Sequence, residues 1–169
     1  MEKKHSHIIY GLITGLVMAV TGLVIYYAGV AFTPGMQYIA YIPFLVGIIL
    51  NAVSYSKSKD GFVTFGNVFG NCFKAAMVVT LIMVVWSLLS MVIFPEMKEK
   101  AITMAREQMM KKQMTDEQMD TAVNMTRKYW NAFLIAGAVF GNLFWGAIFS
   151  LIGGAIAKKK GPQPFVTPI

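Results

Sequence analysis

The chain has 169 residues, of which 56% are hydrophobic and only 14% are charged, and its formal net charge is +7. This composition is far from that of an average soluble domain and indicates a membrane protein. Because many basic residues stand close to apolar stretches, we interpret the positive charge as an orientation signal and as attraction to anionic lipid headgroups, not as a nucleic-acid interface. A single cysteine, Cys72, excludes an internal disulfide framework.

Four long apolar stretches predict four membrane-spanning helices. A helix needs about 20 apolar residues to cross about 30 Å of hydrocarbon, so three stretches are long enough and the second is borderline. The predicted spans are residues 8–32, 38–54, 64–94 and 132–157. The expected fold is all-α, an integral membrane four-helix bundle in one domain, with a proline-rich disordered tail at 158–169. The first apolar run is too long for a signal peptide and lacks a convincing cleavage site, so we interpret it as a retained helix.

Pairs of glycines in two spans predict close contacts between helices. Gly11 and Gly15 in the first span, and Gly137 and Gly141 in the fourth, have the small-xxx-small spacing that lets helix backbones approach each other. A helix that only tolerates glycine is the alternative for the first pair. For the second pair we predict a contact.

Polar side chains within the predicted spans suggest a transport site as a second possibility. Asn71, Lys74 and Asn142 are the candidates. A charge inside a membrane is a functional candidate by default, although Lys74 is close enough to the end of its span to reach the headgroups. Hydrogen bonds between helices explain the asparagines without a substrate.

Residues 95–131 form the only long charged stretch and predict an amphipathic helical hairpin between the third and fourth spans. Thr115-Asp116-Glu117-Gln118 is a capping box, and Met114 and Met119 occupy the two positions of a hydrophobic staple. The first helix of the hairpin follows Pro95, and a short turn is expected near Gln113. Since no breaker follows Trp130, the second helix is expected to continue straight into the fourth span.

Methionine is unusually frequent in this hairpin. Seven of the thirteen methionines lie there: Met97, Met104, Met109, Met110, Met114, Met119 and Met125. Thioethers bind Cu(I), which makes a copper site an alternative, but no Cys or His joins the cluster and a methionine stripe at helical spacing is usually packed core. His5 and His7 are expected in a solvated leader. We therefore predict no metal site, no cofactor and, in the absence of any catalytic motif, no enzyme activity.

Lysine and arginine near the span ends predict the orientation. Four spans place both termini on one side, together with eight basic residues, and the hairpin with its seven on the other. The short loops and the basic segment 158–160 decide the balance, so both termini are expected in the cytoplasm and the hairpin outside.

Several short motifs resemble one bacterial membrane family. They are Gly61-Phe62-Val63-Thr64-Phe65-Gly66, Phe94-Pro95-Glu96, the Met/Glu/Gln/Lys-rich stretch around the capping box, and a glycine-rich last span that ends in lysines. The order of these motifs is similar to that in the family called domain of unknown function 4199. The resemblance implies a small bacterial inner-membrane protein of four helices and assigns no activity or site residues.

The leading hypothesis is a non-enzymatic accessory or scaffold subunit embedded in the lipid bilayer, with a membrane or envelope protein, or a second copy of itself, as partner. The alternative is a small transporter or channel. Its substrate in that case could be a metal ion bound by the methionine-rich hairpin.

Overall fold

The computed structural model describes residues 5–31, 33 and 35–160. Within these residues the chain is helical, with no strand. Its elements are α1 (Ser6–Tyr27), the 3-10 helix η1 (Met36–Tyr38), α2 (Tyr41–Ser58), α3 (Phe65–Ile93), α4 (Glu96–Lys111) and α5 (Asp116–Ile156). The ends of the predicted leader and tail, residues 1–4 and 161–169, lie outside the described part.

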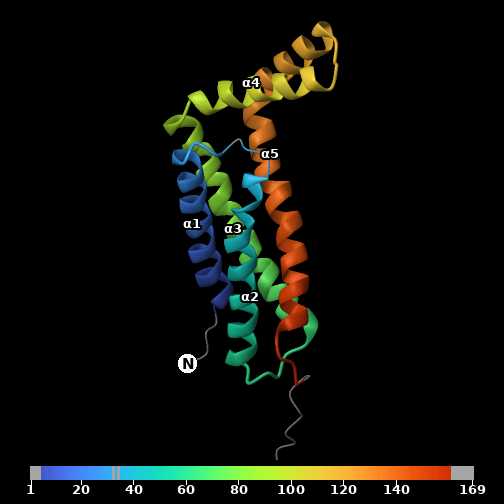
Figure 1. Ribbon diagram of the computed structural model, residues 1–169. Coiled ribbons are helices and arrows are strands. Elements are labelled where there is room, and N and C mark those ends of the chain that lie inside the picture. The colour runs from blue at the N-terminus through green and yellow to red at the C-terminus, as the bar shows by residue number, and fades with distance from the viewer. Residues whose placement is uncertain (1–4, 32, 34, 161–169) are drawn as a thin grey trace, which may run out of the picture.

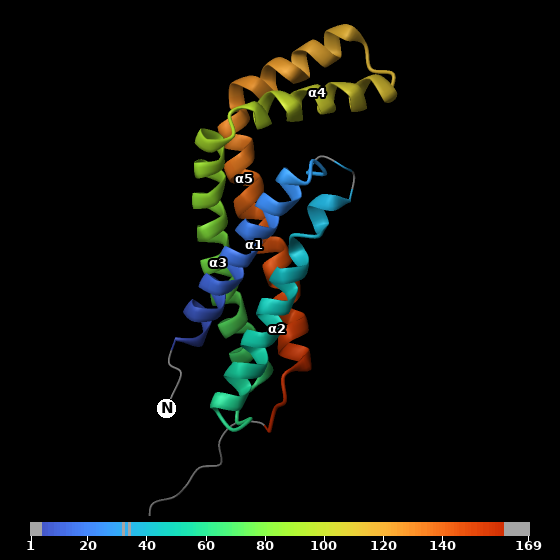
Figure 2. The same ribbon diagram turned by 60° about the vertical axis from the view of Figure 1, so that its left-hand side comes forward.

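Two parts of the molecule are distinct in both ribbon views. Helices α1, α2, α3 and the second part of α5 lie side by side and form a helical body (Figures 1 and 2). Helix α4 and the first part of α5 form an arm, the hairpin, that extends sideways beyond one end of this body. Both ends of the described chain lie at the opposite end of the body.

In the part of the chain that the structure describes, three helices, not four, are long and apolar enough to cross a membrane: α1, α3 and α5. The predicted second span corresponds to α2, which has 18 residues and therefore a length of about 27 Å. Helix α2 packs against α1, α3 and α5. Its buried face includes Asn51 and Ser56, and Lys57 lies in its last turn, so its composition is adapted to protein neighbours as much as to lipid.

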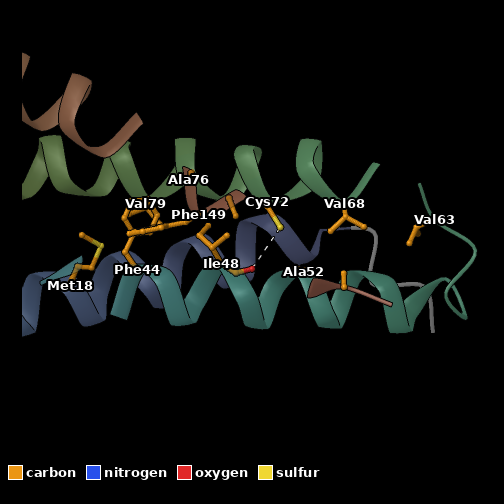
Figure 3. Packing of buried hydrophobic residues seen from close by; sticks show 12 residues of the cluster. Met18, Phe44, Ile48, Ala52, Val63, Val68, Cys72, Ala76, Val79 and Phe149 are labelled. Carbon is orange, nitrogen blue, oxygen red and sulfur yellow. Dashed lines mark hydrogen bonds between the residues drawn. The ribbon is translucent and has the colours of Figure 1, made fainter. Parts of the chain in front are cut away.

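The core of the body is built where these helices cross (Figure 3). Phe44 of α2 meets Phe149 of α5 in an edge-to-face contact with ring centroids 5.3 Å apart, a favoured aromatic geometry. Ile48 and Val79 are also fully or almost fully buried in this cluster. Between these large side chains, alanines and glycines allow the helix backbones to approach each other closely.

Large apolar side chains cover the outside of the body as well. On α1 alone, Ile13, Leu16, Val20 and Val24 are each more than half exposed. In the most apolar 18-residue segment of α3, only 17% of the residues are buried within the protein. Soluble monomers rarely expose apolar patches larger than a few hundred Å². A bilayer is the solvent that satisfies such a surface.

The ends of the helices follow local signals. Thr64 caps α3 by accepting a hydrogen bond from the backbone N–H of Asn67 at 3.3 Å. Helix α5 does continue from the hairpin into the body as expected, but it is not straight. Tyr129 has non-helical backbone angles, φ −107° and ψ 16°, which kink the helix where it enters the body. No proline marks this position, which is why the sequence did not indicate the kink.

The predicted tail is partly ordered. Residues 158–160 follow α5 without helical structure, yet they are attached to the loop between α2 and α3. The backbone N–H of Lys160 donates to the carbonyl of Gly61 at 2.6 Å, and Ser56 Oγ donates to the carbonyl of Lys158. The rest of the predicted tail, residues 161–169, lies outside the described residues.

Candidate functional site

The hairpin is a folded element with its own small core. Ile102 of α4 and Met119 and Val123 of α5 are buried, with 4%, 4% and 8% of their surfaces exposed. The turn between the helices contains Gln113 with φ 57°, a left-handed conformation. Two helices that bury one apolar face against each other form a stable antiparallel pair.

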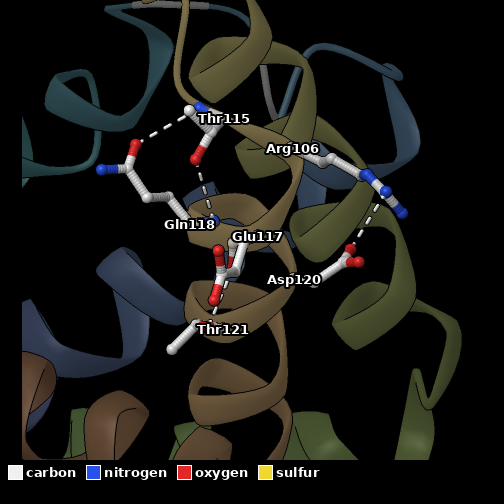
Figure 4. A network of polar contacts seen from close by, with 6 residues as sticks. All are labelled: Arg106, Thr115, Glu117, Gln118, Asp120 and Thr121. Carbon is white, nitrogen blue, oxygen red and sulfur yellow. Dashed lines mark hydrogen bonds and ion pairs between the residues drawn. The ribbon is translucent and has the colours of Figure 1, made fainter.

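Polar contacts hold the hairpin in register (Figure 4). The capping box is present as predicted: Gln118 N–H donates to Thr115 Oγ1 at 3.4 Å, and Thr115 N–H donates to Gln118 Oε1 at 3.2 Å. Across the pair, Arg106 lies 3.1 Å from Asp120. A second ion pair joins Arg127 to Glu99 at 2.6 Å. Both pairs are exposed and contribute little stability individually, but they fix which residues face each other.

The base of the hairpin is anchored on α1. The Tyr26 hydroxyl donates to Glu96 Oε1, and the Tyr26 ring packs on Phe94 with centroids 4.6 Å apart. Lys100 Nζ lies 5.6 Å from the centroid of the Tyr26 ring. The pKa of the Glu96 carboxyl is below its usual range. The hydrogen bond from the Tyr26 hydroxyl is the largest cause, and the hydrogen bond from the backbone amide of Glu96 itself is the second.

A cleft separates α4 from the loop that follows α1. It has a volume of about 680 Å³ and is lined by Gly29, Thr33, Glu96, Glu99, Lys100, Thr103 and Met104, so charged and hydroxyl groups stand among a largely apolar lining surface. The hairpin is thus attached at its base and open along its inner side.

At the other end of the body, three helices bring polar side chains together. Asn51 Nδ2 donates to Asn71 Oδ1 at 2.9 Å, and Ser6 Oγ donates to the same oxygen at 3.2 Å. Asn51 is fully buried, and its own Oδ1 has no partner among the described residues. Cys72 Sγ donates to the carbonyl of Ile48 at 3.7 Å. This cluster links α1, α2 and α3 by hydrogen bonds of the kind that join membrane helices.

The three polar residues predicted as a transport site do not converge. Asn71 belongs to the cluster just described, and Lys74 is exposed on α3. Asn142 donates to the carbonyl of Ala138 on its own helix at 2.7 Å. Gly146 of α5 lies level with Ala76 of α3. Asn142 is four residues from this level toward the hairpin, and Asn71 is five residues from it in the opposite direction. The two asparagines are therefore about 13 Å apart along the helix axis.

Asn142 instead lines a cavity to which four helices contribute. The cavity has a volume of about 310 Å³ and is lined by Met18, Ala40, Tyr41, Met83, Ser87, Leu134, Gly137, Ala138 and Asn142. Its polar groups are a phenol, a hydroxyl and an amide, with no charged side chain. Such a lining suits a small neutral molecule or water more than an ion.

The predicted glycine contacts fall into two groups. A Cβ atom added at Gly11 would lie 2.7 Å from Val78 Cβ, and one at Gly15 would lie 2.6 Å from Ile82 Cδ1, so both glycines lie against α3. At Gly137, by contrast, no atom lies within 4 Å, and at Gly141 only the Tyr41 hydroxyl lies at ordinary contact distance. The contact predicted for this second pair is wrong within the chain, because Gly137 faces the four-helix cavity.

The close approach of α5 occurs further along the helix. A Cβ at Gly146 would lie 2.6 Å from Ala76 Cβ, and one at Gly154 would lie 2.9 Å from the Phe65 ring. At Gly153 the nearest atom, Ala52 Cβ, would lie at 3.1 Å. These three glycines, and not the spaced pair, set the distance between α5 and its neighbours.

Comparison with known families agrees with the motifs in the sequence. The family described as protein of unknown function (DUF4199) matches residues 9–159. The chain belongs to the DUF4199 family. The resemblance expected from the sequence is thereby confirmed. No curated protein and no solved structure matches this DUF4199 protein.

Metal binding by this DUF4199 protein has no support from the usual ligands. Over residues 5–31, 33 and 35–160, no three His, Cys, Asp or Glu side chains lie together. His7 is not in a loose leader as expected but in the first turn of α1, where its Nδ1 is buried without a partner in the described chain. The hairpin methionines point in different directions: Met119 is buried, whereas Met110 and Met125 are more than half exposed. The absence of a metal site stays a prediction, with copper as its untested alternative.

Sequence reasoning missed Ile102 and the cavities. The burial of Ile102 could have been predicted from the sequence, because it is the only branched aliphatic residue of α4. It is the residue of that helix that the structure buries. The cavities had no signal, because they depend on how helices distant in the sequence meet.

Proposed function

We propose that this DUF4199 protein is a non-enzymatic accessory subunit of the bacterial inner membrane, and that its hairpin docks a membrane or envelope protein outside the cytoplasm. In this proposal α2 is a fourth span, both termini are cytoplasmic, and the body is a four-helix bundle in lipid. The outward apolar strip of α2, Ile42, Val46 and Leu50, supports its contact with lipid.

The observation that carries the proposal is the construction of the hairpin. Ile102, Met119 and Val123 give it a core of its own, and its base is attached to α1 through Tyr26. A connection between two spans needs only a few residues, whereas this one is a folded arm with a charged surface and an open cleft of about 680 Å³ beneath it. A preformed arm of this kind reduces the ordering cost of binding a partner.

A mild-detergent pulldown with quantitative mass spectrometry tests the docking role. The hairpin variant Lys111→Glu with Lys128→Glu changes the charge of exposed positions outside its core, and Lys57→Glu is a control at the other end of the body. We expect a stoichiometric partner that is lost with the hairpin variant and kept with the control. A partner retained by both proteins, or no partner at all, contradicts the proposal.

One observation favours a transporter as the second candidate, namely the cavity shared by four helices. A conduit requires that this cavity open to water on both sides of the membrane. Gly137→Cys in a Cys72→Ser background tests this with a small charged thiol reagent. Labelling from both sides supports transport, and protection from both sides shows a sealed cavity that is only a packing gap.

A further inference from the structure

A second cavity lies at the elbow where the hairpin leaves the body. This elbow cavity has a volume of about 320 Å³. It is lined by Ser90, Met91, Phe94, Pro95, Met97, Lys98, Ala101, Trp130, Asn131 and Leu134. The cleft beneath α4 shares none of these residues, and the four-helix cavity shares only Leu134.

Three breaks in helical geometry create the elbow cavity. Helix α3 ends at Ile93, Pro95 turns the chain into α4, and α5 kinks at Tyr129, next to Trp130. The α3–α4 corner and the kink in α5 leave space between them that no side chain fills. The cavity is thus a consequence of how the hairpin is joined to the body.

The elbow cavity lies at the depth of lipid headgroups if the body is inserted as proposed. Helix α3 has 29 residues and is about 43 Å long, which exceeds the hydrocarbon thickness of about 30 Å. Its last turns therefore reach the interfacial layer. Aromatic residues at this level, Tyr26, Tyr27, Phe94 and Trp130, match the belt that membrane proteins place at the interface.

The lining of the cavity is that of a site for an amphiphile. Met91, Phe94, Met97, Trp130 and Leu134 give it an apolar wall. Ser90 and Asn131 add neutral hydrogen-bonding groups, and Lys98 is the one charged residue of the lining. The Lys98 ammonium makes no ion pair within the described part of the chain.

We propose that the elbow cavity binds one anionic glycerophospholipid of the surrounding leaflet. Its phosphate lies at Lys98, Asn131 donates a hydrogen bond to the glycerol region, and an acyl chain follows the apolar wall toward Leu134. The Ser90 hydroxyl, which donates to the carbonyl of Ser87 at 2.8 Å, is left as an acceptor for a headgroup hydroxyl. A cation at the rim of an apolar cavity between membrane helices is the arrangement that recognises anionic lipid headgroups. The bound lipid fills the elbow and stiffens the joint between the body and the hairpin.

Lipid retention by the full-length protein tests the proposal. The protein is incorporated into nanodiscs of equal phosphatidylglycerol and phosphatidylcholine, released, and examined by native mass spectrometry. We expect one phosphatidylglycerol retained with about fivefold preference over phosphatidylcholine, the factor that one lysine near a membrane surface supplies. Lys98→Gln should remove the preference, and Ala101→Phe should remove retention by filling the cavity. Lys111→Glu, a larger charge change on the same helix but outside the cavity, should leave both unchanged.

Fluorescence places the lipid. Brominated phosphatidylglycerol should quench the part of the tryptophan emission that is missing in Trp130→Phe, and Lys98→Gln should reduce this quenching. An unchanged preference in Lys98→Gln, or an equal loss in Lys111→Glu, overturns the proposal. So does displacement of the lipid by soluble glycerol phosphate, because the headgroup alone would then be the ligand. The docking role can fail in the pulldown without affecting any of these results.

Discussion

Substitution of two glycines of α5 by alanine gives the sharpest test of the helix packing. The change is chemically identical at Gly146 and Gly137, and both residues lie within the same helix. Alanine is favoured over glycine in a helix by about 0.5–1 kcal/mol. Any difference between the two variants therefore reports what surrounds the new methyl group.

The surroundings of the two sites are opposite. At position 146 the new Cβ would lie 2.6 Å from Ala76 Cβ and 3.3 Å from Phe44 Cζ. Ala76 has no rotamer to change, so α3 and α5 must separate, and overpacking of this kind costs about 1–3 kcal/mol. After the helix preference is subtracted, Gly146→Ala should destabilise by up to about 2.5 kcal/mol, with a central value of about 1 kcal/mol. At position 137 no atom lies within 4 Å, so Gly137→Ala should stabilise by up to about 1 kcal/mol.

Unfolding in mixed micelles with increasing dodecyl sulfate, followed by circular dichroism, measures both changes. Wild-type protein and both variants are compared at one protein concentration, so that any self-association affects them equally. If Gly146→Ala is as stable as the wild type, or if Gly137→Ala destabilises by as much, then α5 does not pack in this register and the reasoning fails.

Four further predictions concern the hairpin and its base. Thr115→Ala removes the capping box and should cost about 1 kcal/mol; Met119→Ala should cost about 2 kcal/mol or more because the side chain is buried, whereas the exposed Met125→Ala should change stability by less than about 0.5 kcal/mol. Tyr26→Phe should raise the pKa of Glu96 in a carbon-13 titration. Because the folded-state pKa is depressed, the contribution of Glu96 to stability is present above its unfolded pKa and is lost as the pH falls through the folded value. This pH dependence of stability should weaken in the variant. The copper alternative demands that micromolar Cu(I) raise the Tm and that paired Met-to-Leu changes abolish the rise while preserving the fold; an unchanged Tm refutes it.

The sequence predicted best what local interactions determine. The capping box and the turn near Gln113 occur where the pattern placed them, because a cap and a left-handed turn depend on a few adjacent residues. Met119, one of the two positions of the predicted staple, is buried in the hairpin. The length and apolarity of α1, α3 and α5 were equally visible, since lipid imposes them residue by residue.

What depended on distant contacts was predicted less well. Gly137 and Gly146 are both small residues on α5, and only the helix that lies opposite distinguishes a cavity wall from a close contact. The polar candidates Asn71 and Asn142 looked alike for the same reason, although one joins a cluster between helices and the other lines a cavity. The kink at Tyr129 has no local cause in the sequence and arises where the hairpin meets the body.

The orientation of the hairpin is the central claim, because a docking arm must lie where its partner is. Single cysteines are placed in a Cys72→Ser background at Asn124, which is exposed on the hairpin, or at Ser58, at the opposite end of the body, and intact cells are treated with a membrane-impermeant maleimide. We expect labelling at position 124 and none at position 58 until the cells are permeabilised. Labelling at position 58 with protection at position 124 would place the hairpin in the cytoplasm and contradict the account.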